Sequence, residues 1–420
     1  MDRFTVSGGN KLYGTPRIHA AKNSVLPIVA ASALCEGKTI ITDCPDIYDV
    51  SIMGEIIKSL GGKAAFANGT LLIDTENLRD WRMPCGLTQK IRASLFTVGA
   101  LLARFGCASV CKPGGCNIGN RPIDIHIDAF RSLGVDVTEG ENVLFKKNAE
   151  SGGKVRLRYP SVGATESVMT FATSLKGVTV IENAAREPEI VDLQNYLNLL
   201  GAKVSGAGDS VIEVDGGYPL KNREITFKPS KDRIEAGTFL FAGAVCGGEL
   251  TFFNEDLSNL DATLKILSNN ACKIRPKNDR IVSVEFHTPY DGFGKVDAMP
   301  YPMFPTDLQP QLAAAACFAR GVTAIEDKVF PDRFGYVYEL EKFGADITRR
   351  DNLCVVVGKG ELRGARAVAG DLRGGAALLI AALGADGVSE ILNAEHIDRG
   401  YSFVENNFNS LGAKIERVIG

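Results

Sequence analysis

The sequence is poor in residues that bind metal ions, and it has no excess of basic residues. It contains four His, and none of its ten Cys lies in a Cys-x-x-Cys motif, so a zinc site is not expected. Lys and Arg number 47 against 50 Asp and Glu, which gives a net charge of −3. A chain of this charge has no overall basic field to attract nucleic acid. Any site for anions must therefore be local.

The sequence also lacks a long apolar run. No apolar stretch reaches the roughly 18 residues that a membrane-spanning helix needs, and residues 1–4 lack the basic-then-apolar layout of a signal peptide. Cysteines that stand singly in apolar runs are typical of reduced, buried thiols; examples are Cys35, Cys246, Cys317 and Cys354. We expect a cytoplasmic monomer without nucleic-acid or membrane partners, and without a metal or cofactor.

One sequence phrase returns six times, about 70 residues apart. A helix-like run ends in Leu-Gly or its equivalent, and a small or branched residue, a charge and an apolar strand start follow. The copies lie at residues 60–63, 133–136, 200–203, 270–273, 343–346 and 411–414. Gly in most copies suits the left-handed position after a helix, and we expect Asn270 to take that conformation in the fourth copy. The sequence therefore predicts six small αβ subdomains.

Each repeat begins with a helix that is apolar on nearly every side. These helices are predicted over residues 22–34, 92–102, 165–175, 233–245, 307–319 and 373–383. A helix that is hydrophobic all round is buried, so we expect these helices in the centre and the sheets outside them. The predicted fold is α/β (α+β): a two-lobed, inside-out αβ barrel built from six βαβαββ-type repeats, three in each lobe.

A polar segment with a proline, residues 228–232, separates the third repeat from the fourth and is expected to be a linker. The sixth repeat ends at Gly420 short of a full hairpin, and strands over residues 4–6 and 17–19 are expected to complete it. The first lobe is therefore predicted over residues 21–229, and the second over residues 1–20 plus 230–420. Two chain crossings would allow the lobes to close over a substrate.

The first helices start with a charged or hydroxyl residue, in chain order Lys22, Arg92, Thr165, Arg233, Asp307 and Arg373. Helix amino termini offer unpaired N–H groups and a positive dipole end, so several of them converging would form an anion site. Thr165 and Asp307 are equally well explained as ordinary N-caps. The four cations oppose the helix dipole unless an anion arrives, and this favours a binding role for them.

The segment with the most chemical information is the glycine-rich loop over residues 111–124, CKPGGCNIGNRPID. Its thiol, Cys116, lies close in sequence to Lys112 and Arg121, and nearby cations lower the pKa of a thiol. Cys116 is therefore expected to act as a proton donor or a nucleophile near neutral pH. An exposed cysteine in a turn is the alternative interpretation.

This loop and several other motifs resemble the UDP-N-acetylglucosamine 1-carboxyvinyltransferases, a family of enolpyruvyl transferases. The other motifs are Ala21-Lys22-Asn23-Ser24, Arg186-Glu187-Pro188-Glu189-Ile190, Phe304-Pro305-Thr306-Asp307-Leu308-Gln309, Asp371-Leu372-Arg373 and His396-Ile397-Asp398-Arg399-Gly400-Tyr401. The resemblance runs from end to end. It implies transfer of enolpyruvyl from phosphoenolpyruvate to the 3-hydroxyl of UDP-N-acetylglucosamine with release of phosphate, by addition and elimination. That reaction is the first committed step of peptidoglycan synthesis and serves cell-wall formation, cell shape and cell division.

The resemblance also implies roles for individual residues. Lys22, Arg121 and Arg399 would hold the phosphate of phosphoenolpyruvate, and Arg373 would help with its carboxylate. Cys116 matches the acid that protonates the methylene carbon, which is also the thiol that fosfomycin alkylates. Asp307 matches a residue near the sugar hydroxyl that acts as a base or an orienting acceptor. The implied catalytic residues are thus Cys116, Asp307, Lys22 and Arg399.

Further positions are implied to bind the substrates. Asn23 would bridge both of them. The others, mostly for the nucleotide sugar, are Arg92, Arg121, Pro122, Ile123, Asp124, Ile125, Ser161, Val162, Gly163, Arg233, Asp307 and Val329. Departures from the family pattern at Ala20, Asn117, Asn120 and Tyr159 concern loop mobility and nucleotide affinity more than the reacting centre.

Two alternatives stay open. One is the related enolpyruvyl transferase that acts on shikimate 3-phosphate, whose loop lacks the Gly-Gly-Cys arrangement of residues 114–116. The other is a catalytically silent paralogue that senses UDP-sugar or phosphoenolpyruvate. The presence of Lys22, Cys116, Asp307 and Arg399 gives no support to a loss of activity.

Overall fold

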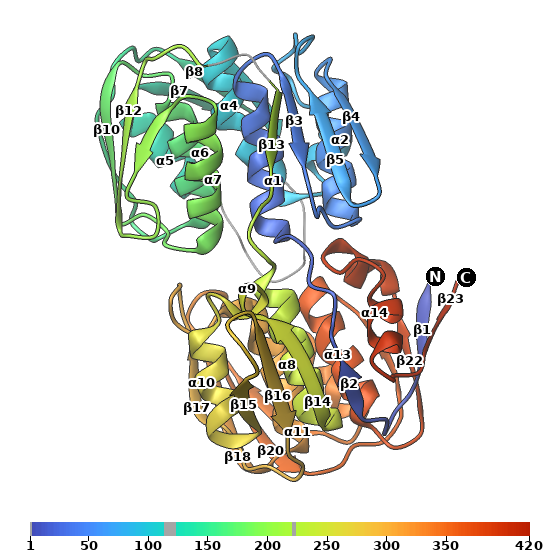
Figure 1. Ribbon diagram of the computed structural model, residues 1–420. Coiled ribbons are helices and arrows are strands. Elements are labelled where there is room, and N and C mark those ends of the chain that lie inside the picture. Colours follow the sequence, from blue (N-terminus) through green and yellow to red (C-terminus); the bar gives the residue numbers. More distant parts are fainter. Residues whose placement is uncertain (1, 113–122, 221–223) are drawn as a thin grey trace. The chain divides into compact units, whose positions relative to one another are not determined.

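The computed structural model describes residues 2–112, 123–220 and 224–420 (Figure 1). These residues divide into two compact units, and each unit has a hydrophobic core of its own. Unit A comprises the described residues between 20 and 230, and unit B comprises residues 2–19 and 231–420. The chain passes from one unit to the other after His19 and after Ser230.

Unit A consists of three αβ repeats. The first has α1 (Lys22–Ala31), η1 (Ser32–Leu34), β3 (Lys38–Ile41), α2 (Tyr48–Ser59), β4 (Lys63–Ala67) and β5 (Thr70–Asp74). The second has α3 (Cys85–Thr88), η2 (Arg92–Leu95), α4 (Phe96–Phe105), β6 (Cys107–Cys111), α5 (Asp124–Ser132), β7 (Val135–Glu139) and β8 (Asn142–Lys147). The third has β9 (Lys154–Arg156), α6 (Val162–Ala172), β10 (Gly177–Glu182), α7 (Pro188–Leu199), β11 (Lys203–Ser205) and β12 (Val211–Gly216), and β13 (Glu224–Phe227) follows.

Unit B repeats the same plan. It starts with β1 (Arg3–Ser7) and β2 (Leu12–Gly14), and continues with α8 (Arg233–Cys246), β14 (Gly248–Phe253), α9 (Asn254–Leu257), α10 (Asp261–Asn270), β15 (Cys272–Pro276) and β16 (Ile281–Phe286). Its second repeat has β17 (Gly294–Ala298), η3 (Thr306–Leu308), α11 (Gln309–Phe318), β18 (Arg320–Asp327), α12 (Val337–Glu341), β19 (Asp346–Arg350) and β20 (Leu353–Lys359). The last has β21 (Arg366–Val368), α13 (Leu372–Gly384), β22 (Val388–Leu392), η4 (Ala394–Arg399), α14 (Val404–Ser410) and β23 (Ile415–Val418).

Each repeat has one small sheet, and the four-stranded ones are mixed. Five sheets have four strands, as in the order β11-β12-β10-β9, where β9 and β10 are parallel and the other pairs antiparallel. The sheet of the second repeat has three strands, β6-β8-β7, and a single parallel bridge between Arg82 and Ser109 stands where the fourth strand would be. The prediction of six αβ repeats, three in each unit, is confirmed.

The six first helices form the centre of their units, as their apolar sequences predict. The buried residues of α1, α6, α8, α11 and α13 include nearly every position of each helix, and those of α4 are the six positions 97–102. In unit B, α8, α11 and α13 contact one another, and the sheets lie outside them (Figure 1). In unit A, α4 contacts both α1 and α6, and a Cβ added to Gly99 in α4 would lie 2.2 Å from the carbonyl oxygen of Ser167 in α6. Only glycine permits so close an approach.

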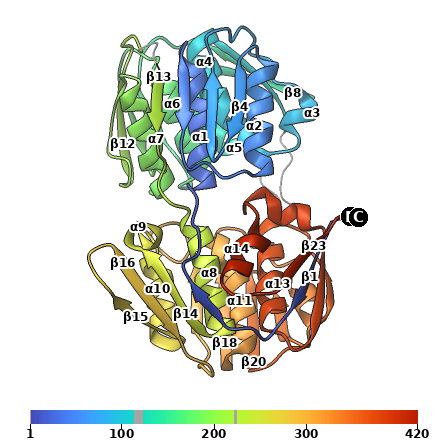
Figure 2. The same cartoon turned by 45° about the vertical axis from the view of Figure 1, so that its right-hand side comes forward.

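The strands that close each unit come from distant parts of the chain. In unit A, β13 pairs in parallel with β3 of the first repeat. In unit B, β1 lies between β22 and β23 and completes the last sheet, as predicted. Figure 2 shows β1 beside β23. The prediction of a strand over residues 17–19 is wrong, because Arg17 and His19 direct their backbone N–H groups to the side chains of Asn407 and Glu235. The second closing strand is β2 instead, which pairs with β14.

The repeated phrase marks the end of the second helix in each repeat. Gly61, Gly134, Gly201, Gly344 and Gly412 all have positive φ angles, between 74° and 103°, as expected of residues that follow a helix. The fourth copy differs from the prediction, since Asn270 is the last residue of α10 and is not left-handed. Its side-chain Nδ2 donates to the carbonyl oxygen of Ile266 at 2.9 Å, so this carbonyl group in the last turn of α10 has a hydrogen-bond donor.

The described part of the chain contains no helix with both the length and the hydropathy for a membrane crossing.

Candidate active site

In unit A, Lys22 is the first residue of α1. Its Nζ lies 2.7 Å from Oδ2 of Asp49 in the first turn of α2, and both side chains are buried. A charge so far from water needs an opposite charge beside it. The first turn of α1 has no side-chain cap among the described residues. The structure thus places an ammonium group at the amino end of a buried helix, beside the carboxylate of Asp49, and Asn23 follows it directly.

The other predicted residues of unit A lie at the starts of neighbouring helices. Arg92 begins η2, which contacts both α1 and α6. Ser161 caps α6, where its Oγ accepts from the backbone N of Ala164 at 3.4 Å, and Val162 and Gly163 form the first turn. A Cβ at Gly163 would lie 3.0 Å from the Phe96 ring. The amino end of α6 therefore lies against the start of α4, and η2 lies against both α1 and α6.

Ile123, Asp124 and Ile125 lie at the start of α5, and all three are half-buried. Asp124 forms an ion pair with Arg158, which also bonds Asp128 at 3.0 Å. Arg158 was not among the predicted residues. The carboxylate of Asp124 already has a cationic partner in the described structure.

In unit B, Asp307 of η3 is shared by two guanidinium groups. Arg333 Nη1 donates to its Oδ1 at 2.6 Å, and Arg373 Nη2 donates to its Oδ2 at 3.1 Å. Burial alone would raise the pKa of Asp307, but Arg333, Arg373 and Arg233 outweigh it and hold that pKa well below its usual range. Asp307 is therefore ionised at all ordinary pH values.

Arg373 is almost completely buried in the first turn of α13, with 3% of its side chain exposed. Its Nη1 donates to the Tyr401 hydroxyl at 3.2 Å, and its Nε has no hydrogen-bond acceptor among the described residues. Burial would lower the pKa of Arg373, but Tyr401, Asp307 and Asp232 raise it above its ordinary value. Arg373 is therefore always positively charged, and its Nε–H group has no acceptor in the described structure.

The remaining predicted residues of unit B lie on three further segments. Arg233 begins α8, is buried, and has its guanidinium 5.5 Å from the centre of the Tyr301 ring. Val329 lies in a turn shaped by Asp327, whose Oδ1 accepts from the backbone N of Val329 at 2.9 Å. Arg399 is the last residue of η4 and is half-buried. Of these, Arg233 is the one whose charge acts on Asp307.

Three predicted residues, Cys116, Arg121 and Pro122, lie outside the described residues. The structure adds two that sequence reasoning missed, Asp49 beside Lys22 and Arg333 beside Asp307. Neither belongs to a motif, and no sequence signal marks Arg333, which lies 26 residues from its partner. The partners of charged groups become visible only when the helices and loops are packed.

A third residue that sequence reasoning missed is Glu166 in α6. It is 1% exposed, and neither of its carboxyl oxygens has a hydrogen-bond partner among the described residues. Burial raises the pKa of Glu166 well above its usual value, and the charges of Glu189 and Glu187 raise it further. At a solution pH near the ordinary pKa of a glutamate, the carboxyl group of Glu166 is therefore still protonated and neutral in the folded protein.

Known proteins with similar sequences include enolpyruvyl (carboxyvinyl) transferases. The sequence profile of the EPSP synthase (3-phosphoshikimate 1-carboxyvinyltransferase) family matches residues 6–408. The chain belongs to the EPSP synthase family. Among curated members, UDP-N-acetylglucosamine 1-carboxyvinyltransferase 2 of Caldanaerobacter subterraneus subsp. tengcongensis is 41% identical over 420 residues, all of both chains. The protein of the same name from Bacillus subtilis is 38% identical over 99% of this chain and 97% of its own.

Solved structures of EPSP synthase family members have the same fold. The enolpyruvyl transferase NikO from Streptomyces tendae superimposes with a TM-score of 0.89 at 25% identity, over 100% of this chain and 99% of NikO. EPSP synthase from Acinetobacter baumannii gives a TM-score of 0.73 at 18% identity, over the whole of both chains. The predicted two-lobed α/β architecture is thereby confirmed.

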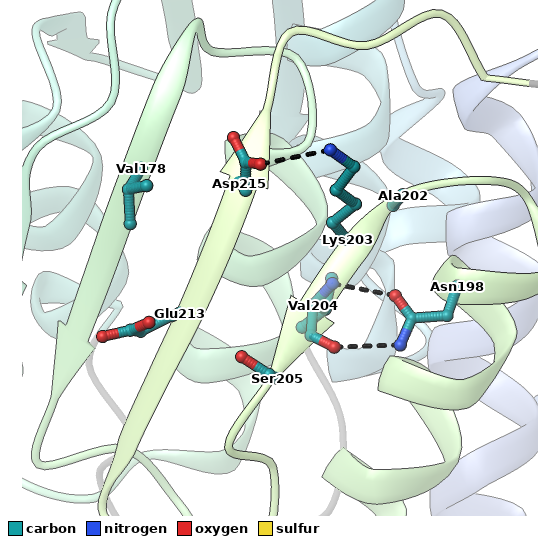
Figure 3. Close-up of a pocket in the computed structure, with 8 residues that line it drawn as sticks. All are labelled: Val178, Asn198, Ala202, Lys203, Val204, Ser205, Glu213 and Asp215. Atoms are coloured by element: carbon teal, nitrogen blue, oxygen red, sulfur yellow. Dashed lines mark hydrogen bonds and ion pairs between the residues drawn. The ribbon is translucent and has the colours of Figure 1, made fainter.

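A surface hollow in unit A is unrelated to the predicted site of this EPSP synthase family member. Figure 3 shows it along α7, β11, β12 and β10, where Asn198 bonds both backbone groups of Val204 and Lys203 pairs with Asp215 at 3.4 Å. None of the residues that line it is a predicted substrate ligand. Three of its polar side chains, those of Asn198, Lys203 and Asp215, already have partners within unit A.

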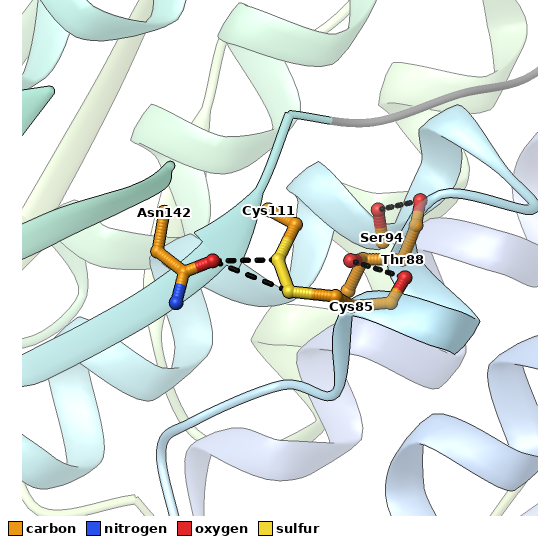
Figure 4. Close-up of a disulfide and its surroundings, with 5 residues drawn as sticks. All are labelled: Cys85, Thr88, Ser94, Cys111 and Asn142. Atoms are coloured by element: carbon orange, nitrogen blue, oxygen red, sulfur yellow. Dashed lines mark hydrogen bonds between the residues drawn. A yellow bond between two sulfur atoms is a disulfide. The ribbon is translucent and has the colours of Figure 1, made fainter. Parts of the chain in front are cut away.

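The prediction that the cysteines are reduced is wrong for one pair. Cys85 of α3 and Cys111 at the end of β6 form a disulfide in unit A, with Asn142 against both sulfur atoms (Figure 4). The two residues are 26 positions apart, and the parallel bridge at Arg82 brings their segments together. Among the other described cysteines, Cys246, Cys317 and Cys354 have free thiols, as predicted.

Proposed function

We propose that the chain transfers the enolpyruvyl group of phosphoenolpyruvate to the 3-hydroxyl of UDP-N-acetylglucosamine and releases phosphate. The observation that carries this proposal is the end-to-end similarity, at 41% and 38% identity, to proteins of the corresponding name. The reaction is the first committed step of peptidoglycan precursor synthesis, so the protein would serve cell-wall formation, cell shape and cell division.

Lys22, with Arg121 and Arg399, is proposed to hold the phosphate of phosphoenolpyruvate. The buried pair with Asp49 supports this role, because it keeps the ammonium group oriented at the start of α1. A fixed cation in a site that excludes water stabilises developing negative charge far more than one in solvent. Asn23, Arg92, Asp124 and the α6 turn at 161–163 are proposed to contact the nucleotide sugar.

Arg373 is proposed to bind the carboxylate of phosphoenolpyruvate, and Asp307 to orient the sugar hydroxyl. A guanidinium group suits a carboxylate because both are planar and form paired hydrogen bonds. Two cationic partners make Asp307 a weak base, since a carboxylate of very low pKa takes up a proton poorly. Of the two roles that the resemblance implies for Asp307, an orienting acceptor is the better supported.

Phosphate release tests the proposal. The protein is mixed with phosphoenolpyruvate and UDP-N-acetylglucosamine, and in a second arm with phosphoenolpyruvate and shikimate 3-phosphate. We expect phosphate in the first arm only. Release in the second arm alone would establish the shikimate activity instead, and binding of both ligands without release in either arm would establish a sensor.

The thiol of Cys116 is proposed as the acid that protonates the methylene carbon. Cys116→Ser should lower turnover strongly and abolish labelling by fosfomycin, measured as the mass of the fosfomycin adduct. Cys116→Asp keeps an ionisable proton donor, so it should retain activity and lose the adduct. Turnover of the Ser variant at the rate of the parent would contradict the assignment.

The protein is further proposed to be a cytoplasmic monomer without a membrane partner. Analytical ultracentrifugation of the full chain, with and without both substrates, measures its mass directly. A sedimentation coefficient that rises with protein concentration would contradict the monomer.

A further inference from the structure

Asp192 of α7 is a buried carboxylate that joins two segments lying far apart in the sequence. Its Oδ2 accepts from the Ser24 hydroxyl at 2.6 Å and from the backbone N of Ser230 at 2.9 Å, and its Oδ1 accepts from the Ser230 hydroxyl at 2.9 Å. Ser24 belongs to the first turn of α1, and Ser230 is the residue after which the chain leaves unit A. We propose that Asp192 is a positioning residue, which fixes the turn that carries Lys22 and Asn23 and thereby sets where these two side chains meet the substrates. This inference rests on the proposed function.

The contacts of Asp192 close a ring of hydrogen bonds around the start of α1. The carbonyl oxygen of Ser230 accepts from the backbone N of Ala21 at 2.8 Å, and the carbonyl oxygen of Ala21 accepts from the backbone N of Ser24 at 2.9 Å. Ala21 stands at the cap position of α1 and has no side chain that could cap it. The orientation of the first turn therefore depends on this ring, and Asp192 is the member that accepts three of its bonds.

Lys22 and Ser24 are held on different sides of α1. Successive residues of a helix are turned by about 100°, so side chains two positions apart point about 200° apart. Lys22 accordingly pairs with Asp49 of α2, whereas Ser24 bonds Asp192 of α7, and α1 contacts both of these helices. The bond of Ser24 can therefore fix the rotation of the turn without occupying the side chain that would hold the phosphate.

Stability alone does not explain a carboxylate at this position. Asp192 is 5% exposed, and no cation pairs with it in the part of the chain that the structure describes. Burial raises the pKa of Asp192, and the hydrogen bonds from Ser24 and Ser230 lower it. Taking a charge out of water without a counter-ion costs free energy. The gain is in orientation, because a carboxylate offers two oxygens to these three donors and an asparagine would offer one.

The test measures kcat and KM for phosphoenolpyruvate, by phosphate release in the full chain with UDP-N-acetylglucosamine, for the parent, Ser24→Ala and Asp192→Asn. A displaced turn weakens binding of the phosphate in the ground state and in the transition state alike, so KM should rise and kcat should change little. We expect kcat/KM to fall about tenfold for Ser24→Ala and about 30-fold for Asp192→Asn, since a displacement of about 1 Å can cost about a hundredfold.

Ser32→Ala is the matched control. Ser32 is also buried, follows α1 directly, and donates its hydroxyl to the carbonyl oxygen of Val29 at 2.6 Å, the same length as the bond of Ser24. Both alanine variants should lower the urea midpoint by similar amounts, because each loses one buried hydroxyl bond. Only Ser24→Ala should raise KM. A merely structural role of Ser24 predicts the same kinetics for both variants.

A double-mutant cycle shows whether Ser24 acts through Asp192. Ser24→Ala added to Asp192→Asn should lower kcat/KM by less than about threefold further. If Asp192→Asn does not unfold cooperatively, Ser230→Ala, which removes the bond to Oδ1, replaces it in the cycle. The full tenfold loss in both backgrounds, or a KM of Ser24→Ala within about twofold of the parent, would overturn the inference while the parent still turns over. A parent that releases no phosphate would overturn the proposed function, and this inference with it.

Discussion

The two units start their buried helices in different ways. In unit B, α8 and α13 follow Asp232 and Asp371, and each carboxylate accepts two backbone N–H groups of the first turn at 2.9–3.1 Å. In unit A, α1 and η2 have no side-chain cap among the described residues, and Ser161 makes one bond of 3.4 Å. The scaffold therefore caps α8 and α13 with carboxylates, whereas η3 of unit B, like α1 and η2 of unit A, has no side-chain cap in the part of the chain that the structure describes.

The arrangement of charge differs in the same sense. In unit A, Lys22 pairs with the carboxylate of Asp49, whereas in unit B the carboxylate of Asp307 pairs with two guanidinium groups. Because α8 and α13 of unit B are already capped by carboxylates, an anion beside these two helix ends would be bound by side chains. In unit A, backbone N–H groups and Lys22 can act together.

The largest effect is expected at the cation of unit A. Lys22→Met should lower kcat/KM for phosphoenolpyruvate about a thousandfold, because the phosphate loses a buried positive charge. Steady-state phosphate release measures this. Lys58→Met is the control, since Lys58 is exposed and pairs only with Glu55, at 2.8 Å, in the contacts described. A loss of less than tenfold for Lys22→Met would show that unit A does not hold the phosphate through this residue.

The disulfide is a second difference between the units, because unit A has it and the described cysteines of unit B are all free. The Cys85→Ser, Cys111→Ser double variant should lower the free energy of unfolding by about 3 kcal/mol, because the unfolded chain loses a closed loop. Urea unfolding without reductant measures it. Adding dithiothreitol should bring the parent to the value of the variant. A parent that does not respond to reductant has no such bond in solution.

Removing a helix cap should lower the free energy of unfolding by less than loss of the disulfide, and by more in unit B than in unit A. Asp371→Ala should cost about 1–2 kcal/mol of unfolding free energy, because two N–H groups of α13 lose their acceptor. Ser161→Ala in unit A should cost less than about 1 kcal/mol, since it removes one long bond. Asp371→Asn keeps an acceptor and serves as the control. A larger loss for Ser161→Ala than for Asp371→Ala would reverse the comparison.

The last effect concerns Glu166 of unit A, and it is absent at pH values below the ordinary carboxyl pKa. Its pKa is raised in the folded state, so the folded protein holds the proton at pH values where the unfolded chain has released it. Stability should therefore fall as the pH rises from the ordinary carboxyl pKa toward the raised one, by at most about 1.4 kcal/mol per pH unit. Glu166→Gln should remove this slope, and Glu213→Gln, at an exposed position on β12, should keep it. Equal slopes for the parent and Glu166→Gln, from urea unfolding at several pH values, would contradict the assignment.

Much of the fold was predictable because its signals are local. The apolar first helices and the Leu-Gly ends of the second helices follow from residues that are neighbours in sequence. Two local predictions failed where a side chain supplied a hydrogen bond that the sequence pattern does not show. Glu235 takes the backbone N–H of His19, and Asn270 bonds Ile266 within its own helix.

The candidate site was predictable in its residue types and not in its pairings. Lys22, Asp307 and Arg373 stand out as charges at the starts of apolar helices. Their partners Asp49 and Arg333 do not, and the disulfide of Cys85 and Cys111 contradicts the prediction from composition. A contact between residues tens of positions apart has no signature in either segment alone.

Sequence alone determined that this chain repeats one αβ plan six times, buries its first helices and carries cations where those helices begin, because periodicity and apolarity are properties of short segments. Tertiary structure alone decided which opposite charge each cation meets, 66 residues away for Asp307 and Arg373, and which helix ends are capped. The reason is physical: the strength of an ion pair depends on separation and burial, and both are set only when the repeats pack against one another.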